Sequence, residues 1–161
     1  MNDLFKHAIL SPCAKYRYAL YRQWDKTLPS VMFLMLNPST ADARKDDPTI
    51  RKCMAYAKDW GYGGIVVGNI YAFRSKDPKD LLHCNDPIGP LNDSYLYELT
   101  NKYPMVICAW GNNLENPKRI KHLIGRGVRM THCLELTKSG QPKHPLYLRG
   151  NLRPKKLSLA I

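Results

Sequence analysis

An asparagine and a group of acidic residues follow the first strongly apolar segment of the sequence. The segment VMFLML, residues 31–36, leads into Asn37, and Asp42, Asp46 and Asp47 follow in the same stretch. A side-chain amide orients a ligand or a water molecule through hydrogen bonds but hardly removes a proton, whereas a carboxylate supplies negative charge. The stretch therefore predicts a polar site, and the sequence leaves open which of the three carboxylates belongs to it.

The elements that must position these residues are a predicted alternation of strands and helices. The expected strands are 31–36, 64–73, 103–110 and 127–136, and the expected helices are 48–60, 90–102 and 116–124. The first three strand segments are apolar almost throughout, which is typical of strands buried on both faces of a parallel sheet. The sequence therefore predicts an α/β fold, with three α/β/α layers around a central, mostly parallel four-stranded sheet.

One domain is expected over residues 1–161. The alternating segment 15–24 predicts a strand that forms a hairpin with residues near 8–11. The domain would consist of an N-terminal β extension at 1–28, an α/β core at 31–136 and a basic loop and tail at 137–161. The length suits a single core, and no repeat or linker divides the chain.

Polar and aromatic side chains are expected to gather where the predicted strands end. Ligands of open α/β sheets bind beyond the carboxyl ends of the strands. The residues that the sequence places there are Asn37, Ser39, Asn69, Tyr71, Phe73, Trp110 and His144. This rim of the sheet is therefore the predicted binding site.

Positive charge is concentrated in the C-terminal part of the sequence. The formal net charge is +12, and residues 101–161 hold 12 lysines or arginines against two acidic residues. A basic surface attracts polyanions and speeds their capture. The distribution favours nucleic acid as the partner, and a solvated basic surface without that function is the alternative.

The cysteines and the hydropathy pattern exclude several classes of protein. The five cysteines are odd in number and show no C-x-x-C spacing, which argues against a disulfide framework and a four-cysteine metal site. No apolar run reaches 18 residues, and the N-terminus lacks the pattern of a secretory signal. We expect a cytoplasmic, monomeric protein that uses no metal or cofactor and binds no membrane.

Four short motifs resemble those of the uracil-DNA glycosylase superfamily and come in the same order. They are LMLNPS (34–39), VVGNIYAF (66–73), ICAWGNN (107–113) and GQPKHPLYL (140–148). In that superfamily an Asn-Pro or Asp-Pro pair follows the first core strand, an asparagine on the second strand reads the base, and a His-Pro motif comes late. The whole chain also resembles a family of short bacterial and phage proteins of formerly unknown function that looks like an offshoot of these glycosylases.

The resemblance implies a monofunctional DNA glycosylase, which hydrolyses the N-glycosidic bond of a flipped base in double-stranded DNA. Asn37 would hold the attacking water, Asn69 would bind the base edge, and His144 would stabilise negative charge on the leaving base. Asp42 or Asp47, or Asp46 between them in the same stretch, would supply negative charge beside the sugar cation.

Further residues complete the site that the resemblance implies. Ser39, Tyr71 and Phe73 are expected to contact the base. The residues expected to contact DNA are Lys138, Lys143, Tyr147, Arg149 and Arg153. The motifs contain no obvious lysine nucleophile, so hydrolysis without strand cleavage is expected.

The sequence departs from the superfamily pattern in ways that bear on the substrate. Met35 stands where glycine often precedes the Asn-Pro pair, and Leu146 stands where serine usually follows His-Pro, which leaves Leu146 or Tyr147 to fill the gap in the duplex. No tyrosine closely follows Asn37 to exclude bulky ring substituents. We therefore expect a modified pyrimidine, such as the hypermodified cytosine of phage DNA, and a role in defence against phages.

Two other functions fit the same residues. An enzyme of this fold acting on free nucleotides or nucleosides would use the basic tail to attract its substrate. A non-catalytic DNA-binding module would keep the scaffold without the chemistry. A steep salt dependence separates DNA binding from nucleotide binding, and the appearance of abasic sites separates a glycosylase from a simple binder.

Overall fold

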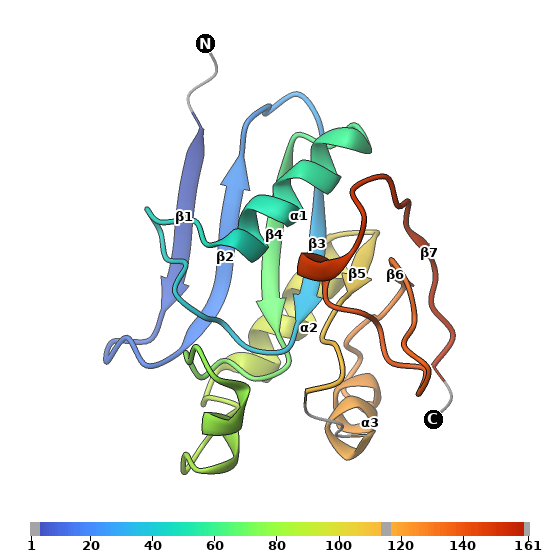
Figure 1. The fold of residues 1–161 in the computed structure, drawn as a ribbon. Coiled ribbons are helices and arrows are strands. Elements are labelled where there is room, and N and C mark those ends of the chain that lie inside the picture. The colour runs from blue at the N-terminus through green and yellow to red at the C-terminus, as the bar shows by residue number, and fades with distance from the viewer. Residues whose placement is uncertain (1–3, 114–116, 160–161) are drawn as a thin grey trace.

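One mixed β-sheet organises the protein (Figure 1). A computed structural model describes residues 4–113 and 117–159. The strands are β1 (Phe5–Leu10), β2 (Arg17–Gln23), β3 (Ser30–Met35), β4 (Gly64–Asn69), β5 (Val106–Cys108), β6 (His132–Cys133) and β7 (Lys155–Lys156). In the described residues the sheet has seven strands, in the order β1-β2-β4-β3-β5-β6-β7.

The middle of this sheet is parallel, and both edges are antiparallel. β3 pairs in parallel with β4 and β5, and β5 pairs in parallel with β6. The predicted N-terminal hairpin of β1 and β2 is confirmed, but it is no separate extension, because β2 pairs antiparallel with β4. The α/β class is therefore confirmed, while the expected four-stranded sheet is too small, since the hairpin and β7 extend it at its two edges.

The three α-helices lie close to their predicted places. They are α1 (Pro48–Asp59), α2 (Asn92–Lys102) and α3 (Pro117–Gly125), and two short 3-10 helices, η1 (Pro78–Leu82) and η2 (Pro145–Tyr147), lie in the loops. α1 begins at the residue that the sequence predicts. The Asp47 side chain caps the helix, and Pro48 is tolerated in the first turn because an N–H group there would have no acceptor within the helix.

Helices pack on both faces of the sheet. Successive residues of β3 point to opposite faces, so Phe33 packs with residues of α1 and Leu34 packs with residues of α2 and α3. In Figure 1 α1 crosses in front of the sheet, and α2 and α3 lie behind it. The central strands β3, β4 and β5 are consequently buried almost completely, as their apolar sequences predict.

No helix in the described ranges has the length and apolar character needed to cross a bilayer.

All five cysteines are free thiols, and Cys53, Cys108 and Cys133 are buried in the interior. Buried thiols of this kind pack as small hydrophobic side chains.

Candidate functional site

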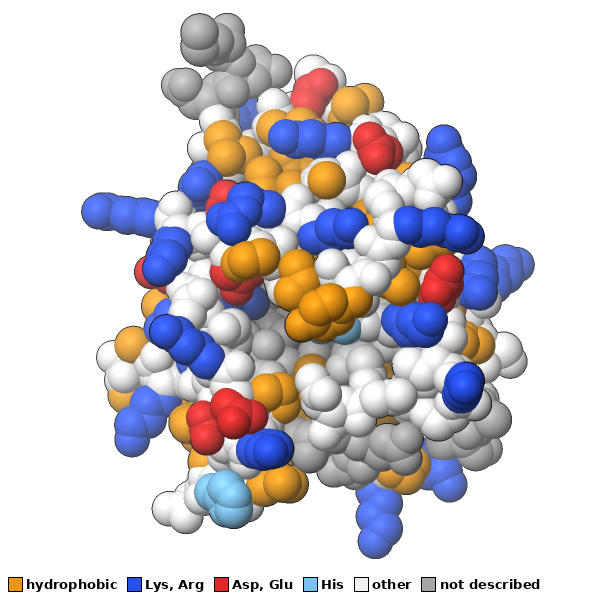
Figure 2. Space-filling model, viewed as in Figure 1, with side chains coloured by type: hydrophobic (Ala, Val, Ile, Leu, Met, Phe, Trp, Pro, Cys, Tyr) orange, Lys and Arg blue, Asp and Glu red, His pale blue; other side chains and the backbone are white. Residues whose placement is uncertain are grey.

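A cavity, here called the rim cavity, lies where β3 and β4 end and α1 begins. Its volume is about 180 Å³, and a cavity of about 150 Å³ is known to hold one benzene ring. Figure 2 shows a hollow near the centre of this face, with lysine and arginine side chains around it. The polar residues that line the cavity include Arg17, Asn37, Ser39, Asp47, Asn69 and His144. The rim cavity is therefore large enough for one flat, polar ring.

Asn37 directly follows β3, and the backbone around it fixes its amide. Its Nδ2 donates hydrogen bonds to the carbonyl oxygens of Ser75 at 3.1 Å and Pro38 at 3.2 Å. No donor in the described part of the chain binds the Asn37 Oδ1 atom. Because the nitrogen is engaged, the oxygen remains as an acceptor for a water molecule or a ligand.

Asn69 ends β4 and lies buried beside Arg17 of β2. Arg17 donates from Nη1 to the carbonyl of Ala41 at 2.9 Å and from Nη2 to Asn69 Oδ1 at 3.5 Å. Burial lowers the pKa of Arg17 to about 10, and the negative charge of Asp47 opposes that shift. The guanidinium group therefore stays positive at neutral pH.

Two donor atoms of this pair have no hydrogen-bond partner among the described residues. They are Arg17 Nε and Asn69 Nδ2, and the two residues are 2% and 1% exposed. Buried donors are nearly always paired, because an unpaired one loses its hydration without compensation. Both residues line the rim cavity, so a ligand with acceptor atoms would complete them.

Asp47 is the member of the three acidic residues that lines the rim cavity. Its Oδ1 accepts a hydrogen bond from the backbone N–H of Ile50 at 2.9 Å, which caps α1 and holds the carboxylate in place. Asp42 lies outside this cavity, and its carboxylate accepts hydrogen bonds from the N–H groups of Arg44 and Lys45, both at 2.8 Å. The structure therefore places the Asp42 carboxylate in a turn and does not bring it together with Asn37, Asn69 and His144 in the rim cavity.

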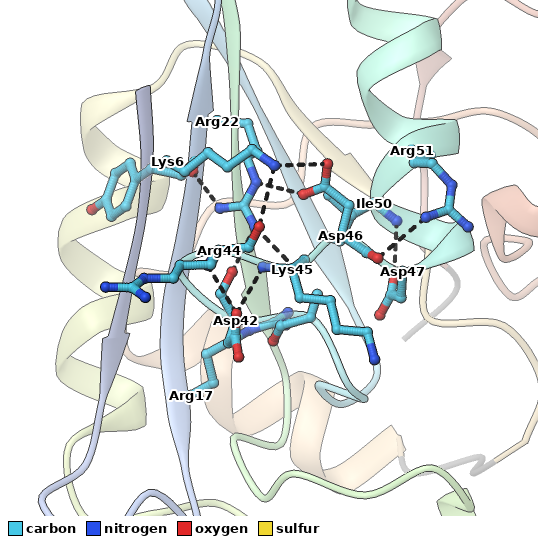
Figure 3. Close-up of polar contacts among 12 residues, drawn as sticks. Lys6, Arg17, Arg22, Asp42, Arg44, Lys45, Asp46, Asp47, Ile50 and Arg51 are labelled. Atoms are coloured by element: carbon cyan, nitrogen blue, oxygen red, sulfur yellow. Dashed lines mark hydrogen bonds and ion pairs between the residues drawn. The ribbon is translucent and has the colours of Figure 1, made fainter. Parts of the chain in front are cut away.

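The third acid, Asp46, belongs to a buried network that holds the loop (Figure 3). Arg22 of β2 is fully buried and donates from Nε to Asp46 Oδ1 at 2.7 Å, and Lys6 Nζ lies 3.4 Å from Asp46 Oδ2. Burial alone would raise the pKa of Asp46, but the hydrogen bond and the charge of Arg22 hold it below its usual value. The N-terminal hairpin therefore fixes the loop that carries Asp47.

His144 reaches the rim cavity from the C-terminal loop. Its Nδ1 accepts a hydrogen bond from the backbone N–H of Leu146 at 3.2 Å, which places the proton of the neutral ring on Nε2. Burial lowers the pKa of His144, and the charge of Asp47 opposes this without cancelling it. At neutral pH the side chain is thus an uncharged ring, and no described residue accepts a hydrogen bond from its Nε2–H.

The loop around His144 is anchored on two sides. The N–H of Gly111, just after β5, donates to the carbonyl of Pro142 at 2.7 Å, and the φ angle of Gly111 is 72°. On the other side, the hydroxyl of Tyr56 and the Nε1 of Trp60, both on or beside α1, donate to carbonyl oxygens of residues 149 and 152. The histidine therefore sits in a fixed place even though it lies in a loop.

Ser39 lines the rim cavity as predicted, but the two predicted base-contacting aromatics do not. β4 ends at Asn69, and the chain then leaves the sheet, so strand alternation no longer places the residues beyond it. Tyr71 is 5% exposed in the core beside α2 and α3, and its ring lies 5.8 Å from the Arg119 guanidinium. Phe73 packs edge-on against Tyr16 in a neighbouring groove. The structure therefore does not bring either ring together with Asn69 in the rim cavity.

The residues predicted to contact DNA are scattered along the C-terminal segment. Lys138 and Arg149 are exposed, Lys143 pairs with Glu135 at 3.2 Å, and Arg153 lies beside Trp60 at the end of α1 away from Asp47. Tyr147 is 88% exposed, and its ring centre lies 6.4 Å from that of His144. Tyr147 is therefore the one of these five with an observed contact to a residue of the rim cavity.

Sequence reasoning missed Arg17 and a group of basic residues near the rim cavity. A wider groove shares Ser39, Ser75 and Lys76 with the cavity. Further basic side chains on its walls are Lys15, Lys45 and Arg74. They come from segments before β5, whereas the charge count had directed attention to the C-terminal tail.

Within residues 4–113 and 117–159, no group of three or more histidine, cysteine or acidic side chains is arranged to hold a metal ion.

Comparison with known proteins places the chain in a family. A model of DUF1643, described as a protein of unknown function, matches residues 17–146, which is most of the 161-residue chain. The chain belongs to DUF1643. The DUF1643 match begins at Arg17 and ends at Leu146, so it spans every residue of the rim cavity named above. Searches among curated proteins and among solved structures found no match. DUF1643 membership therefore brings no activity with it, and a function has to be argued from the cavity.

Proposed function

We propose that this DUF1643 protein is a monofunctional DNA glycosylase that removes a flipped, modified base from double-stranded DNA and leaves an abasic site. The observation that carries the proposal is that Asn37, Asn69 and His144 line one ring-sized cavity together with Asp47. Asn37, Asn69 and His144 are far apart in the sequence, and they come from three motifs that resemble those of the uracil-DNA glycosylases. Strand ends of an α/β sheet converge in any case, so the support lies in the kinds of side chain that line the cavity, two amides and a neutral imidazole beside a carboxylate.

The chemistry of these side chains suits hydrolysis of an N-glycosidic bond. When the bond between the sugar carbon C1′ and the base nitrogen breaks, its electron pair leaves with the base and the sugar becomes positive. The Asp47 carboxylate would stabilise the sugar cation, and the neutral His144 would donate from Nε2 to the base. Both interactions strengthen as charge develops, so they stabilise the transition state more than the substrate.

Water completes the reaction at the sugar. The Asn37 oxygen would accept a hydrogen bond from this water and orient it towards C1′. The water oxygen forms the new bond to C1′, and the proton it loses passes to the Asp47 carboxylate. Asp47 then gives up this proton to solvent and the departing base takes one from solvent, so Asp47 returns to the carboxylate form and the products are an abasic sugar and a neutral free base.

Binding of the duplex would involve the exposed face around the rim cavity. Turning a base out of the helix costs about a few kcal/mol, which contacts to the DNA must offset. Tyr147 is an exposed aromatic beside His144 and suits filling the space that the base leaves, whereas Leu146 is only partly exposed. The lysine and arginine side chains on this face would bind the phosphates on either side (Figure 2).

A modified base is the proposed substrate, and the hypermodified cytosine of phage DNA is the candidate that we favour. The rim cavity itself has room for about one ring, but it shares Ser39, Ser75 and Lys76 with the wider groove. A substituent on the ring would extend into that groove, where these polar side chains would bind it. Excision of such bases would serve defence against phages.

The proposal is tested by incubating the protein with a panel of duplex DNAs that includes phage genomes with hypermodified cytosine. We expect alkali-labile abasic sites and a released base that mass spectrometry identifies. Asn37→Ala should abolish both, whereas the control Asn151→Ala, at an exposed asparagine beside the far end of α1, should leave both intact.

Two other outcomes would replace the proposal. Tight, salt-dependent DNA binding without abasic sites on any substrate would identify a DNA-binding module. Release of bases from free nucleotides or nucleosides, with DNA untouched, would identify an enzyme of nucleotide metabolism.

A further inference from the structure

The hydrogen bond between Arg17 and Asn69 fixes the orientation of the Asn69 amide. A guanidinium group has only donors, so the atom of Asn69 that faces Arg17 Nη2 at 3.5 Å must be the oxygen. The amide nitrogen then points elsewhere, and no described residue accepts a hydrogen bond from it. Both side chains line the rim cavity.

This orientation limits which edge of a base Asn69 can read. A free asparagine amide can pair with a donor and an acceptor at once, such as N3–H and O4 of uracil. Here the positive guanidinium group already lies on the oxygen, and its charge opposes the approach of a further N–H group. Asn69 is left to act as a donor, and Arg17 Nε is a second donor that has no partner among the described residues.

We propose that Arg17 is a specificity-determining residue, which makes the rim cavity select pyrimidines that carry a 4-amino group over pyrimidines that carry a 4-oxo group. Cytosine presents two adjacent acceptors, N3 and O2, which match two donors. Uracil presents the N3–H donor between its two oxygens, which sets a donor against a donor. This inference deepens the proposed function, because it assumes that the cavity receives a base.

The surroundings of Arg17 support a role in binding over a purely structural one. It is buried and charged, yet it donates to the carbonyl of Ala41 and to Asn69 Oδ1, and neither acceptor is a carboxylate. The Asp47 carboxylate nearby acts on it through its charge and binds the N–H of Ile50. In contrast, the buried Arg22 of the same strand is neutralised by Asp46.

The test uses two bases that differ in this group alone. 5-Hydroxymethylcytosine and 5-hydroxymethyluracil are placed in the same duplex sequence, and kcat/KM for their release is measured. Binding of the two free bases is measured separately by calorimetry. We expect the wild-type protein to prefer the 4-amino base by about tenfold or more, which is the effect of one mismatched buried hydrogen bond.

Variants separate selectivity from stability. Arg17→Met removes the guanidinium group and frees the Asn69 oxygen, so the preference should fall to about threefold or less or reverse. Arg17→Lys keeps a positive donor and should retain a preference. Arg22→Lys, at a buried arginine of the same strand that does not line the cavity, should lower the melting temperature yet leave the ratio unchanged.

Each result decides between the inference and the proposed function. A wild-type protein that excises both bases equally, or prefers the 4-oxo base, overturns the inference and leaves the glycosylase intact, even where Arg17→Met does not fold. A protein that releases no base from any DNA of the panel, phage genomes included, but binds the free 4-amino base more tightly overturns the glycosylase and leaves the inference intact. Equal or absent binding without excision overturns both.

Discussion

The pair of Arg22 and Asp46 offers the sharpest test of how the N-terminal hairpin holds the site. Arg22 is fully buried, and Asp46, with a side chain 17% exposed, is the carboxylate that neutralises it through a 2.7 Å hydrogen bond. Asp46→Asn keeps the shape of the side chain and one acceptor oxygen but removes the charge. A buried guanidinium group would then lack its counter-ion.

The expected magnitude follows from the burial of the pair. Removing one partner of a buried ion pair typically destabilises a protein by about 3–5 kcal/mol. Because Asp46 is partly exposed and asparagine still accepts a hydrogen bond, we expect a loss of about 2–3 kcal/mol in the free energy of unfolding. For a chain of 161 residues this lowers the melting temperature by about 4–12 °C.

The assay is thermal unfolding with a matched control and a double variant. Lys6 is the more exposed partner of Asp46, with a side chain that is 31% exposed. The control variant Lys6→Met should therefore lower the free energy of unfolding by less than about 1 kcal/mol. In an Arg22→Met background, Asp46→Asn should also lower the free energy of unfolding only slightly, because the guanidinium group that Asp46 neutralises is absent.

The stabilisation that Asp46 contributes should decrease as the pH falls. The pKa of Asp46 lies below the usual 3.8 in the folded protein, so its contribution is present above pH 3.8 and is lost as the pH falls through the folded value. Equal melting temperatures of Asp46→Asn and wild type at pH 7, or an equal cost in both backgrounds, would refute the reasoning.

Three further predictions concern the rim cavity and its edge. His144→Asn keeps an acceptor for the N–H of Leu146 but removes the Nε2 donor, so kcat in the excision assay should fall by about 100-fold while the melting temperature changes little. Because burial lowers the pKa of His144 below 6.5, its neutral form persists down to pH 6.5, so the excision rate should be level from pH 8 to 6.5 and fall only in more acidic buffers; a rate that rises on acidification would contradict a neutral donor. Tyr147→Ala should reduce excision from duplex DNA by about tenfold and from single-stranded DNA much less, and equal losses on both would show that the ring does not fill a gap in the duplex.

The central strands were predictable because burial on both faces leaves a local trace in the sequence. β3 and β4 appear as continuous apolar segments, and the start of α1 is marked by Asp47 and Pro48. The pairing of β2 with β4 leaves no such trace, because its partners, such as Leu20 and Val67, are distant in the sequence. The sheet was therefore predicted with the right class and too few strands.

The candidate site was predictable only as far as strand ends converge. Asn37, Asn69 and His144 were found by this rule and by the motif resemblance, and they do line one cavity. The choice of Asp47 over Asp42 needed three dimensions, since both lie in one loop. The sequence shows how many basic residues each segment holds but not on which face of the protein they lie. The basic C-terminal tail was therefore predicted as the DNA-binding region, and the basic residues near the rim cavity were missed.

Arg17 was missed for a related reason. An arginine in a strand segment with alternating polar residues usually faces water. β2 lies inside the sheet, with β1 on one side and β4 on the other, so a side chain at its end can reach the cavity. Nothing local distinguishes this arginine from a surface one.

Asp47 links the start of a helix to the charge of the rim cavity, since its carboxylate both binds the N–H of Ile50 and lines the cavity. Serine and asparagine begin helices about as well as aspartate does, but they bring no negative charge. Under the proposed glycosylase function, a member of the family that keeps the fold without excising bases would be expected to carry serine or asparagine here. The identity of this single residue could serve as a marker that sorts active from inactive relatives before any of them is purified.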